Sequence, residues 1–298
     1  MTYFSSQGTL HPTPPFDFHK SLYFLKLFSQ TKTDQVLTDR SLMKAISIDG
    51  QPIVFCVKAT GKVGKPELEY FLISEQAISE QAKFAVLDRT SFFLSLYDNL
   101  ESFYRIGASD LNFNPVIQKL YGYHQVKFLT PFENACWTIL CQQTPFSVAK
   151  DLKQKLMLEF GSFVTVRGAE LRAYPEPFQI AYETVSQLSK LLEDDYKAEC
   201  INYIARAFDR IEEEFLRNAP YEEVSNWLMS LKGVSEWAAN FIMLRGLGRM
   251  EKAPVVDKRL IASAAKFYGD NIFHGISNVA NQYGKWQGYW AHYLRVAA

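Results

Sequence analysis

Apolar and polar residues follow two different patterns along the chain, and the change of pattern divides it. In the first hundred residues, short apolar runs typical of strands lie between two stretches with helical spacing. Asp49-Gly50 separates the first two runs and is a hairpin signal, because glycine accepts the positive φ of such turns. The pattern predicts a small N-terminal α/β domain over residues 1–104, with helices over 18–28 and 77–100 and antiparallel strands over 45–48, 53–57 and 68–73.

Beyond about residue 105 the strand signals fade and helical spacing dominates. Thr130-Pro131-Phe132-Glu133 has the pattern of a capping box, with proline at the first helical position. We predict an α+β fold that is predominantly α, with a central helical domain over 128–245 and a second helical subdomain from 105–127 plus 246–298. The helices are expected at 131–142, 147–161, 177–182, 186–192, 199–215, 221–231, 236–246, 258–268 and 286–296.

Composition indicates a folded protein without a metal centre. Apolar residues make up 48% and charged residues 21% of the 298 positions, and no apolar run approaches the roughly 20 residues that span a bilayer. The four cysteines and five histidines lack metal-ligand spacing, so neither a catalytic metal nor an organic cofactor is expected. The first residues carry no secretory pattern. We expect a cytoplasmic monomer, associated with the nucleoid if the source is bacterial, and no membrane partner.

Charge is balanced overall, at 32 basic and 32 acidic side chains, which alone disfavours a polyanionic partner. The distribution is uneven. Residues 183–223 hold eleven acids against five bases, whereas residues 225–298 hold nine bases against four acids. A basic face could therefore exist near the C-terminal end, although ordinary solvated helix surfaces would give the same counts.

Two helices joined by a very short turn form the most informative segment, at about 221–246. Gly233 interrupts the helical pattern and Ser235 is a natural N-cap for the second helix. The free amides and the positive dipole end of such a helix can bind a phosphate. A simple packing corner of an all-α protein is the alternative interpretation.

This segment resembles the helix-hairpin-helix of the base-excision DNA glycosylases. Leu231–Ala239 is similar to their hairpin, and Asp257 follows Trp237 by 20 positions, as in the AlkA-type 3-methyladenine DNA glycosylase II branch. Three more segments resemble motifs of that branch in the same order, at 14–18, 132–143 and 285–292. The resemblance implies two helical subdomains with a DNA-binding and active-site cleft between them. It also implies a repair enzyme that removes alkylated purines from double-stranded DNA.

Asp257 is the expected catalytic residue. Cleavage of an N-glycosidic bond builds positive charge on the deoxyribose, and a fixed carboxylate stabilises that charge and can activate water. The same aspartate could simply cap the helix that follows it, and the two roles are compatible. Trp237 stands where bifunctional relatives place a nucleophilic lysine, so we predict a monofunctional enzyme that leaves an intact abasic site.

The resemblance assigns further roles. The base pocket is expected from Phe24, Trp237, Phe241 and Trp286, although these could be plain core aromatics. Gln143 is the expected wedge that fills the gap left by a flipped base, although a simple loop would also fit there. The expected DNA contacts are Lys232, Gly233, Val234, Ser235, Arg245, Lys258 and Arg259, and the carbonyls of Met229, Leu231 and Val234 are expected to hold a structural monovalent cation.

Several residues depart from the branch. Lys232 replaces the usual proline and Ser235 the usual second glycine, while Glu236 puts a negative charge near the expected phosphate. These departures bear on DNA affinity more than on fold. They leave three alternatives open: a glycosylase of the same fold for oxidised or deaminated bases, a non-catalytic protein that binds damaged DNA, and a helical interaction protein without a nucleic-acid partner.

Overall fold

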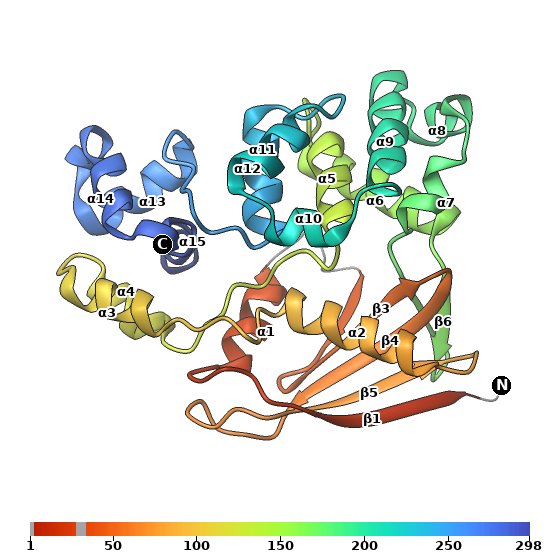
Figure 1. Cartoon of the computed structure of the whole chain (residues 1–298), viewed down its shortest axis with the longest axis horizontal. Coiled ribbons are helices and arrows are strands. Elements are labelled where there is room, and N and C mark those ends of the chain that lie inside the picture. The colour runs from red at the N-terminus through yellow and green to blue at the C-terminus, as the bar shows by residue number, and fades with distance from the viewer. Residues whose placement is uncertain (1–2, 28–33) are drawn as a thin grey trace.

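A five-stranded antiparallel sheet forms the N-terminal part of the protein (Figure 1). The structure, a computed structural model, describes residues 3–27 and 34–298. The strand order β1-β5-β4-β3-β2 comprises β1 (Phe4–Leu10), β5 (Leu68–Ser74), β4 (Gln51–Ala59), β3 (Ser41–Ile48) and β2 (Gln35–Leu37). The predicted hairpin turn is present: Asp49 has a φ of 51° and Gly50 a φ of 79°, and Ile48 pairs with Gln51.

Two helices lie close to this sheet. Helix α1 (Phe18–Leu27) follows the prediction, apart from Phe28, which lies outside the described residues. Helix α2 (Glu80–Phe93) contacts β3 and β4. The helix predicted over 77–100 is therefore too long, because the chain leaves helical geometry after Phe93 and Ser95 takes a φ of 52°.

The rest of the chain is predominantly helical, which confirms the predicted fold class. Thr130 caps α5, since its Oγ1 accepts a hydrogen bond from the Glu133 amide at 3.1 Å. The second half of the predicted capping box is wrong, because the Glu133 carboxylate contacts Lys153 in the interior. The helices are α3 (Glu101–Ser109), α4 (Asn114–Leu120), α5 (Pro131–Leu140), α6 (Phe146–Phe160), α7 (Pro177–Ala181), α8 (Val185–Leu192), α9 (Asp195–Phe208), α10 (Glu213–Asn218), α11 (Tyr221–Met229), α12 (Glu236–Arg245), α13 (Lys258–Tyr268), α14 (Ile276–Gln282) and α15 (Gln287–Ala297), with short 3₁₀ turns η1 (Asp270–His274) and η2 (Gly284–Trp286).

Two departures from the predicted pattern lie in the middle of the chain. A small hairpin of β6 (Phe163–Val166) and β7 (Ala169–Arg172) packs against the large sheet and was not predicted, because each strand has only four residues. The helix predicted over 199–215 is also wrong. Helix α9 begins at Asp195 and ends at Phe208, and α10 is a separate short helix.

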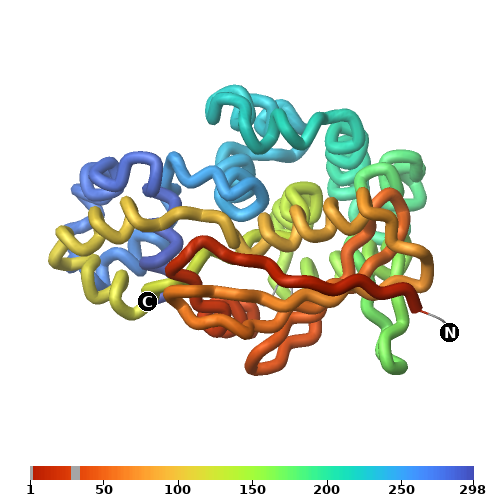
Figure 2. The backbone as a smooth tube through the Cα atoms, turned by 60° about the horizontal axis from the view of Figure 1, so that its bottom comes forward, coloured from red at the N-terminus to blue at the C-terminus, as the bar shows by residue number. Residues whose placement is uncertain are grey.

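Buried side chains form two large cores. One joins the sheet and α1–α4 to the C-terminal helices, and the other lies among α5–α12. Helices α13–α15 accordingly lie beside α3 and α4, far along the molecule from the start of β1 (Figure 1 and Figure 2). A buried ion cluster links β2 and β3 to the second core. Lys153 of α6 contacts Asp34 and, at 2.8 Å, Glu133, while Lys44 lies 3.9 Å from Asp34.

Candidate functional site

The predicted hairpin is present between α11 and α12. Gly233 lies in the turn with a φ of 82°, and a Cβ built on it would lie 2.6 Å from the Cys200 Sγ, so glycine is required there. Ser235 caps α12, because its Oγ accepts a hydrogen bond from the Ala238 amide at 3.2 Å. Ser235 and Glu236 are exposed. The first turn of α12 is therefore open to an external ligand.

The basic residues expected around this turn have different environments. Lys258 and Arg259 are exposed at the start of α13, as a phosphate contact requires. Lys232 is exposed but forms an ion pair with Glu199. Arg245 departs from the prediction of a backbone contact. Its guanidinium donates to the Val126 carbonyl at 2.8 Å, lies over the Phe24 ring and lines an internal cavity, and burial lowers the pKa of Arg245 to about 10.

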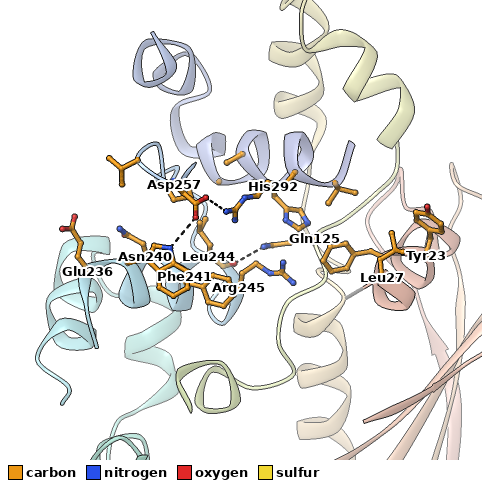
Figure 3. Close-up of a pocket in the computed structure, with 18 residues that line it drawn as sticks. Tyr23, Leu27, Gln125, Glu236, Asn240, Phe241, Leu244, Arg245, Asp257 and His292 are labelled. Carbon is orange, nitrogen blue, oxygen red and sulfur yellow. Dashed lines mark hydrogen bonds and ion pairs between the residues drawn. The ribbon is translucent and has the colours of Figure 1, made fainter. Parts of the chain in front are cut away.

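Asp257 lies at the N-cap of α13 with its two carboxylate oxygens in different environments. Oδ1 accepts hydrogen bonds from the amides of Arg259 at 2.8 Å and Leu260 at 3.1 Å, and Arg295 of α15 lies 2.8 Å from the same oxygen. Oδ2 has one long contact, from the Trp237 indole N–H at 3.5 Å (Figure 3). The aspartate is thus a helix cap through Oδ1, while Oδ2 keeps its capacity to accept a further hydrogen bond.

The electrostatic surroundings of Asp257 favour its ionised form. Partial burial acts to raise its pKa, but the charge and hydrogen bond of Arg295, together with the two backbone amides, outweigh burial and lower the pKa below its usual value of 3.8. The side chain is 12% exposed, so it is neither sealed in the core nor free in solvent. A carboxylate in this state is charged at neutral pH.

Asp257 lines a cavity of about 470 Å³ where elements of both cores meet (Figure 3). Phe24 of α1 and Trp237 and Phe241 of α12 line the same cavity. The rings of Trp237 and Phe241 are stacked, with centroids 5.4 Å apart and planes 14° apart, as their spacing of four residues on one helix allows. Trp237 is half exposed, which a purely structural core aromatic would not be. The structure therefore places a carboxylate beside a set of aromatic faces.

Trp286 corrects the sequence analysis, because the structure separates it from these aromatics. Its indole N–H donates to the Ser102 Oγ at 2.9 Å and its ring packs on Phe103 and Tyr289. It lines a second, more open depression between α3 and the start of α15. Of the four aromatic residues predicted for the base pocket, three line the cavity of Asp257 and Trp286 does not.

Comparisons with known proteins point to one group. A scan against models of protein families finds no match. A DNA-3-methyladenine glycosylase of Bacillus subtilis is 24% identical over 235 residues, which are 77% of this chain and 78% of that protein. The structure of a 3-methyladenine DNA glycosylase of Archaeoglobus fulgidus is similar with a TM-score of 0.79 and 22% identity over 97% of both chains. An 8-oxoguanine glycosylase/lyase of Clostridium acetobutylicum has a TM-score of 0.69 and 14% identity over 100% of this chain and 99% of that chain.

In sequence the chain is similar to a DNA-3-methyladenine glycosylase, and its fold is that of the helix-hairpin-helix DNA glycosylases. Within this fold, the turn expected to carry the wedge lies next to the hairpin. Gln142, after the end of α5, donates from Nε2 to the Gly233 carbonyl at 2.7 Å. Gln143 follows with an exposed side chain and a φ of 50°. Gln143 stays a predicted wedge, on a turn that is tied to the hairpin.

The three backbone carbonyls expected to hold a monovalent cation flank the same hairpin. The Leu231 carbonyl accepts a hydrogen bond from the Val234 amide at 3.1 Å. Within the described part of the chain, the carbonyls of Met229 and Val234 accept no such bond from the backbone outside regular helices. Backbone carbonyls are suitable ligands for monovalent cations, so these residues fit such an ion.

Several residues of the cavity are not found by sequence reasoning, and three of them are polar side chains close to the base-sized space. Arg295 and His292 lie on α15 one turn apart, and Gln125 lies in the segment before α5. His292 ends the C-terminal motif at 285–292 and Arg295 follows it at helical spacing, whereas Gln125 carries no motif.

In the part of the chain that the structure describes, none of the helices has the length and hydrophobicity of a membrane span.

Proposed function

We propose that this protein is a monofunctional DNA glycosylase of base excision repair that hydrolyses the N-glycosidic bond of alkylated purines, of the 3-methyladenine and 7-methylguanine type, in double-stranded DNA. The observation that carries the proposal is the half-open carboxylate of Asp257. Its Oδ1 is held by two amides and Arg295, and its Oδ2 faces an aromatic cavity next to the hairpin.

The proposed mechanism begins with rotation of the damaged base out of the duplex into the cavity. The faces of Trp237 and Phe241 offer stacking to an electron-poor or cationic base, which is worth about 2 kcal/mol once water is excluded. As the glycosidic bond breaks, positive charge develops on the sugar and is stabilised by the ionised Asp257. Oδ2 orients or deprotonates the attacking water, because Oδ1 is already occupied.

The hairpin is the proposed grip on the DNA backbone. The amides at the turn of Gly233 and Ser235 and at Trp237 would bind phosphates of the lesion strand, and the exposed Lys258 and Arg259 add charge beside them. The carbonyls of Met229, Leu231 and Val234 would hold a monovalent cation when one is bound, and its charge would strengthen this grip.

The residues at the site support a reaction without strand cleavage. Trp237 offers no amine, and within the described part of the chain the cavity is lined by no lysine. Lys232 is engaged by Glu199, whose hydrogen bond raises the pKa of Lys232. A Schiff base with the sugar has no nucleophile here. Borohydride treatment of the protein with lesion DNA should give no covalent adduct, and an efficient adduct would overturn the monofunctional proposal.

The names of similar proteins support the substrate class, since both the Bacillus subtilis relative and the Archaeoglobus fulgidus structure are 3-methyladenine DNA glycosylases. The Clostridium acetobutylicum neighbour acts on 8-oxoguanine, so a glycosylase for oxidised bases is the second candidate. Mass spectrometry of bases released from duplexes that carry 3-methyladenine, 7-methylguanine, 8-oxoguanine, hypoxanthine or uracil separates the two. Release of oxidised or deaminated bases alone would favour the second candidate.

A protein that only binds damaged DNA, or a helical interaction protein, would release no base at all. The deciding experiment is mass spectrometry of bases liberated from methylated DNA by the wild type beside Asp257→Asn. We expect 3-methyladenine and 7-methylguanine from the wild type and a strong loss in the variant. Equal binding of abasic DNA by both proteins, without release by either, would indicate a non-catalytic binder. No binding of abasic DNA at low salt would indicate an interaction protein.

A further inference from the structure

Among the described residues that line the cavity, one buried acceptor has no hydrogen-bond partner. Gln125 is 1% exposed and lines the cavity of Asp257. Its side-chain Nε2 donates to the Leu244 carbonyl at 3.1 Å, which fixes the orientation of the amide because a carbonyl needs a donor. Its Oε1 has no hydrogen-bond partner within the described part of the chain. A buried acceptor in this state costs free energy that a ligand with an N–H donor would recover.

The segment that carries Gln125 is held in place on both sides of its peptide unit. The backbone carbonyl of Gln125 accepts a hydrogen bond from the Ser95 hydroxyl at 2.6 Å, and its backbone N–H lies 3.5 Å from the Tyr289 hydroxyl. The side chain lies between Leu244 and His292 (Figure 3). The acceptor is therefore positioned before any ligand arrives, which limits the entropy lost on binding.

At this end of the cavity, the side-chain oxygen of Gln125 is the neutral hydrogen-bond acceptor that remains for a ligand. Burial, with the charges of Arg245 and Arg295, lowers the pKa of His292 well below its usual value, so its ring is neutral. The same ring is engaged by the Tyr123 hydroxyl at 2.9 Å and packs edge-on against Phe24. A flat base that enters between these rings would bring one polar edge toward Gln125.

We infer that Gln125 is a specificity-determining residue, whose Oε1 accepts a hydrogen bond from an exocyclic amino group of the flipped base. The inference rests on the proposed function and deepens it: the site favours adenine-type bases over their deaminated counterparts. A hypoxanthine-type base has a carbonyl oxygen in place of that amino group, and in the pose that suits adenine this oxygen and Oε1 are two acceptors that repel each other. 7-Methylguanine has the same carbonyl at C6 but keeps an exocyclic amino group at C2 that can serve as the donor. The Gln125 nitrogen already has a partner, so the free energy to be gained lies at the oxygen.

Adenine and hypoxanthine as free bases provide a test on the wild-type protein. The two bases are neutral and differ at this edge by an amino group against a carbonyl. Quenching of intrinsic tryptophan fluorescence reports binding, because Trp237 lines the cavity. We expect adenine to bind about tenfold or more tightly than hypoxanthine, as one buried hydrogen bond allows. Equal binding, or tighter binding of hypoxanthine, would overturn the inference.

Single-turnover release from DNA tests the residue itself. Gln125→Leu should lower the ratio of 3-methyladenine to hypoxanthine excision by about tenfold. Asn202→Leu is the matched control, since it removes a buried amide that donates to the Glu183 carbonyl at 2.9 Å in the second core, away from the cavity. It should leave the ratio unchanged. If Gln125→Leu folds and the ratio is unchanged, the proposed role of Gln125 is refuted, while the glycosylase proposal is not affected.

The two proposals fail in distinguishable ways. If the wild type releases no base from methylated DNA, the glycosylase proposal fails, while the free-base titration still decides whether Gln125 reads an amino group. If bases are released but the ratio does not depend on Gln125, the glycosylase proposal stands. If Gln125→Leu does not fold, the wild-type titration remains decisive.

Discussion

Arg295 and Asp257 form an ion pair of 2.8 Å that engages only one oxygen of the carboxylate. The same Oδ1 also takes the amides of Arg259 and Leu260, so the pair fixes the side chain and leaves Oδ2 toward the cavity. Arg295 comes from α15, 38 positions after Asp257 in the sequence. The C-terminal helix therefore helps to lower the pKa of the proposed catalytic residue.

Replacement of Arg295 should change the pH dependence of base release. Arg295 lowers the pKa of Asp257, and the reaction needs the ionised form. The wild-type rate governed by Asp257 should therefore fall only at pH values below the ordinary range of an aspartate, as Asp257 becomes protonated. In Arg295→Gln the acid limb of the pH profile should move to higher pH, because the positive charge that lowers the pKa of Asp257 is gone. Single-turnover rates between pH 3.5 and 8 measure this shift.

Arg259→Gln is the control for this prediction. It removes an exposed positive charge, but its backbone amide still donates to Oδ1. Its acid limb should coincide with that of the wild type. An unmoved limb in Arg295→Gln would mean that the ion pair does not set the pKa that governs the rate.

Glu236 should weaken DNA binding, because it places a negative charge on the first turn of α12, where a phosphate is expected. Glu236→Gln should tighten binding to a duplex with an abasic-site analogue by about two- to fivefold at low salt, the size of a charge effect at a helix end. The same change lowers helix stability slightly, since an acid there favours the dipole. Fluorescence anisotropy at several salt concentrations measures the affinity.

Glu223→Gln provides the matched control for charge, because Glu223 is exposed at the opposite end of α11 from the hairpin. Its effect on affinity should be small. If both variants tighten binding equally, the phosphate does not lie at the first turn of α12.

The sequence predicts three of the five strands, β3, β4 and β5, and the helix-hairpin-helix turn, because each is a local signal; it does not predict β1 and β2. Asp49-Gly50 needs only two adjacent residues, and Gly233 and Ser235 mark a helix end and a helix start. Trp286 was misplaced because its environment is set by Ser102 and Phe103, nearly two hundred positions earlier. Arg245 is predicted as a DNA contact and instead lines the cavity for the same reason, since its partners Val126 and Phe24 come from distant segments.

Gln143 should contribute to binding of DNA with a missing base. Its side chain is exposed on the turn that Gln142 ties to the hairpin. Gln143→Ala should weaken affinity for an abasic-site analogue and leave affinity for intact duplex unchanged. Ser147→Ala, an exposed change on the first turn of α6, controls for the neighbourhood. Unchanged affinity in Gln143→Ala would assign the wedge to another residue.

The buried ion cluster should matter for stability rather than for chemistry. Lys153 is 2% exposed and lies between Asp34 and Glu133, so Lys153→Met leaves the buried Glu133 without its cation and Asp34 with the longer contact to Lys44. We expect the free energy of unfolding to fall by about 3–5 kcal/mol in urea denaturation. Lys155→Met, on the same helix, breaks a more exposed pair with Glu193 and should have a much smaller effect on stability. Equal losses would contradict the role of the cluster.

The central claim is that Asp257 stabilises the transition state of base release without being needed to hold DNA. Single-turnover release of 3-methyladenine by Asp257→Asn, measured beside its affinity for a duplex with an abasic-site analogue, tests it most directly. The account predicts a rate at least about a hundredfold below that of the wild type, with affinity retained. A variant that releases the base at the wild-type rate would contradict it.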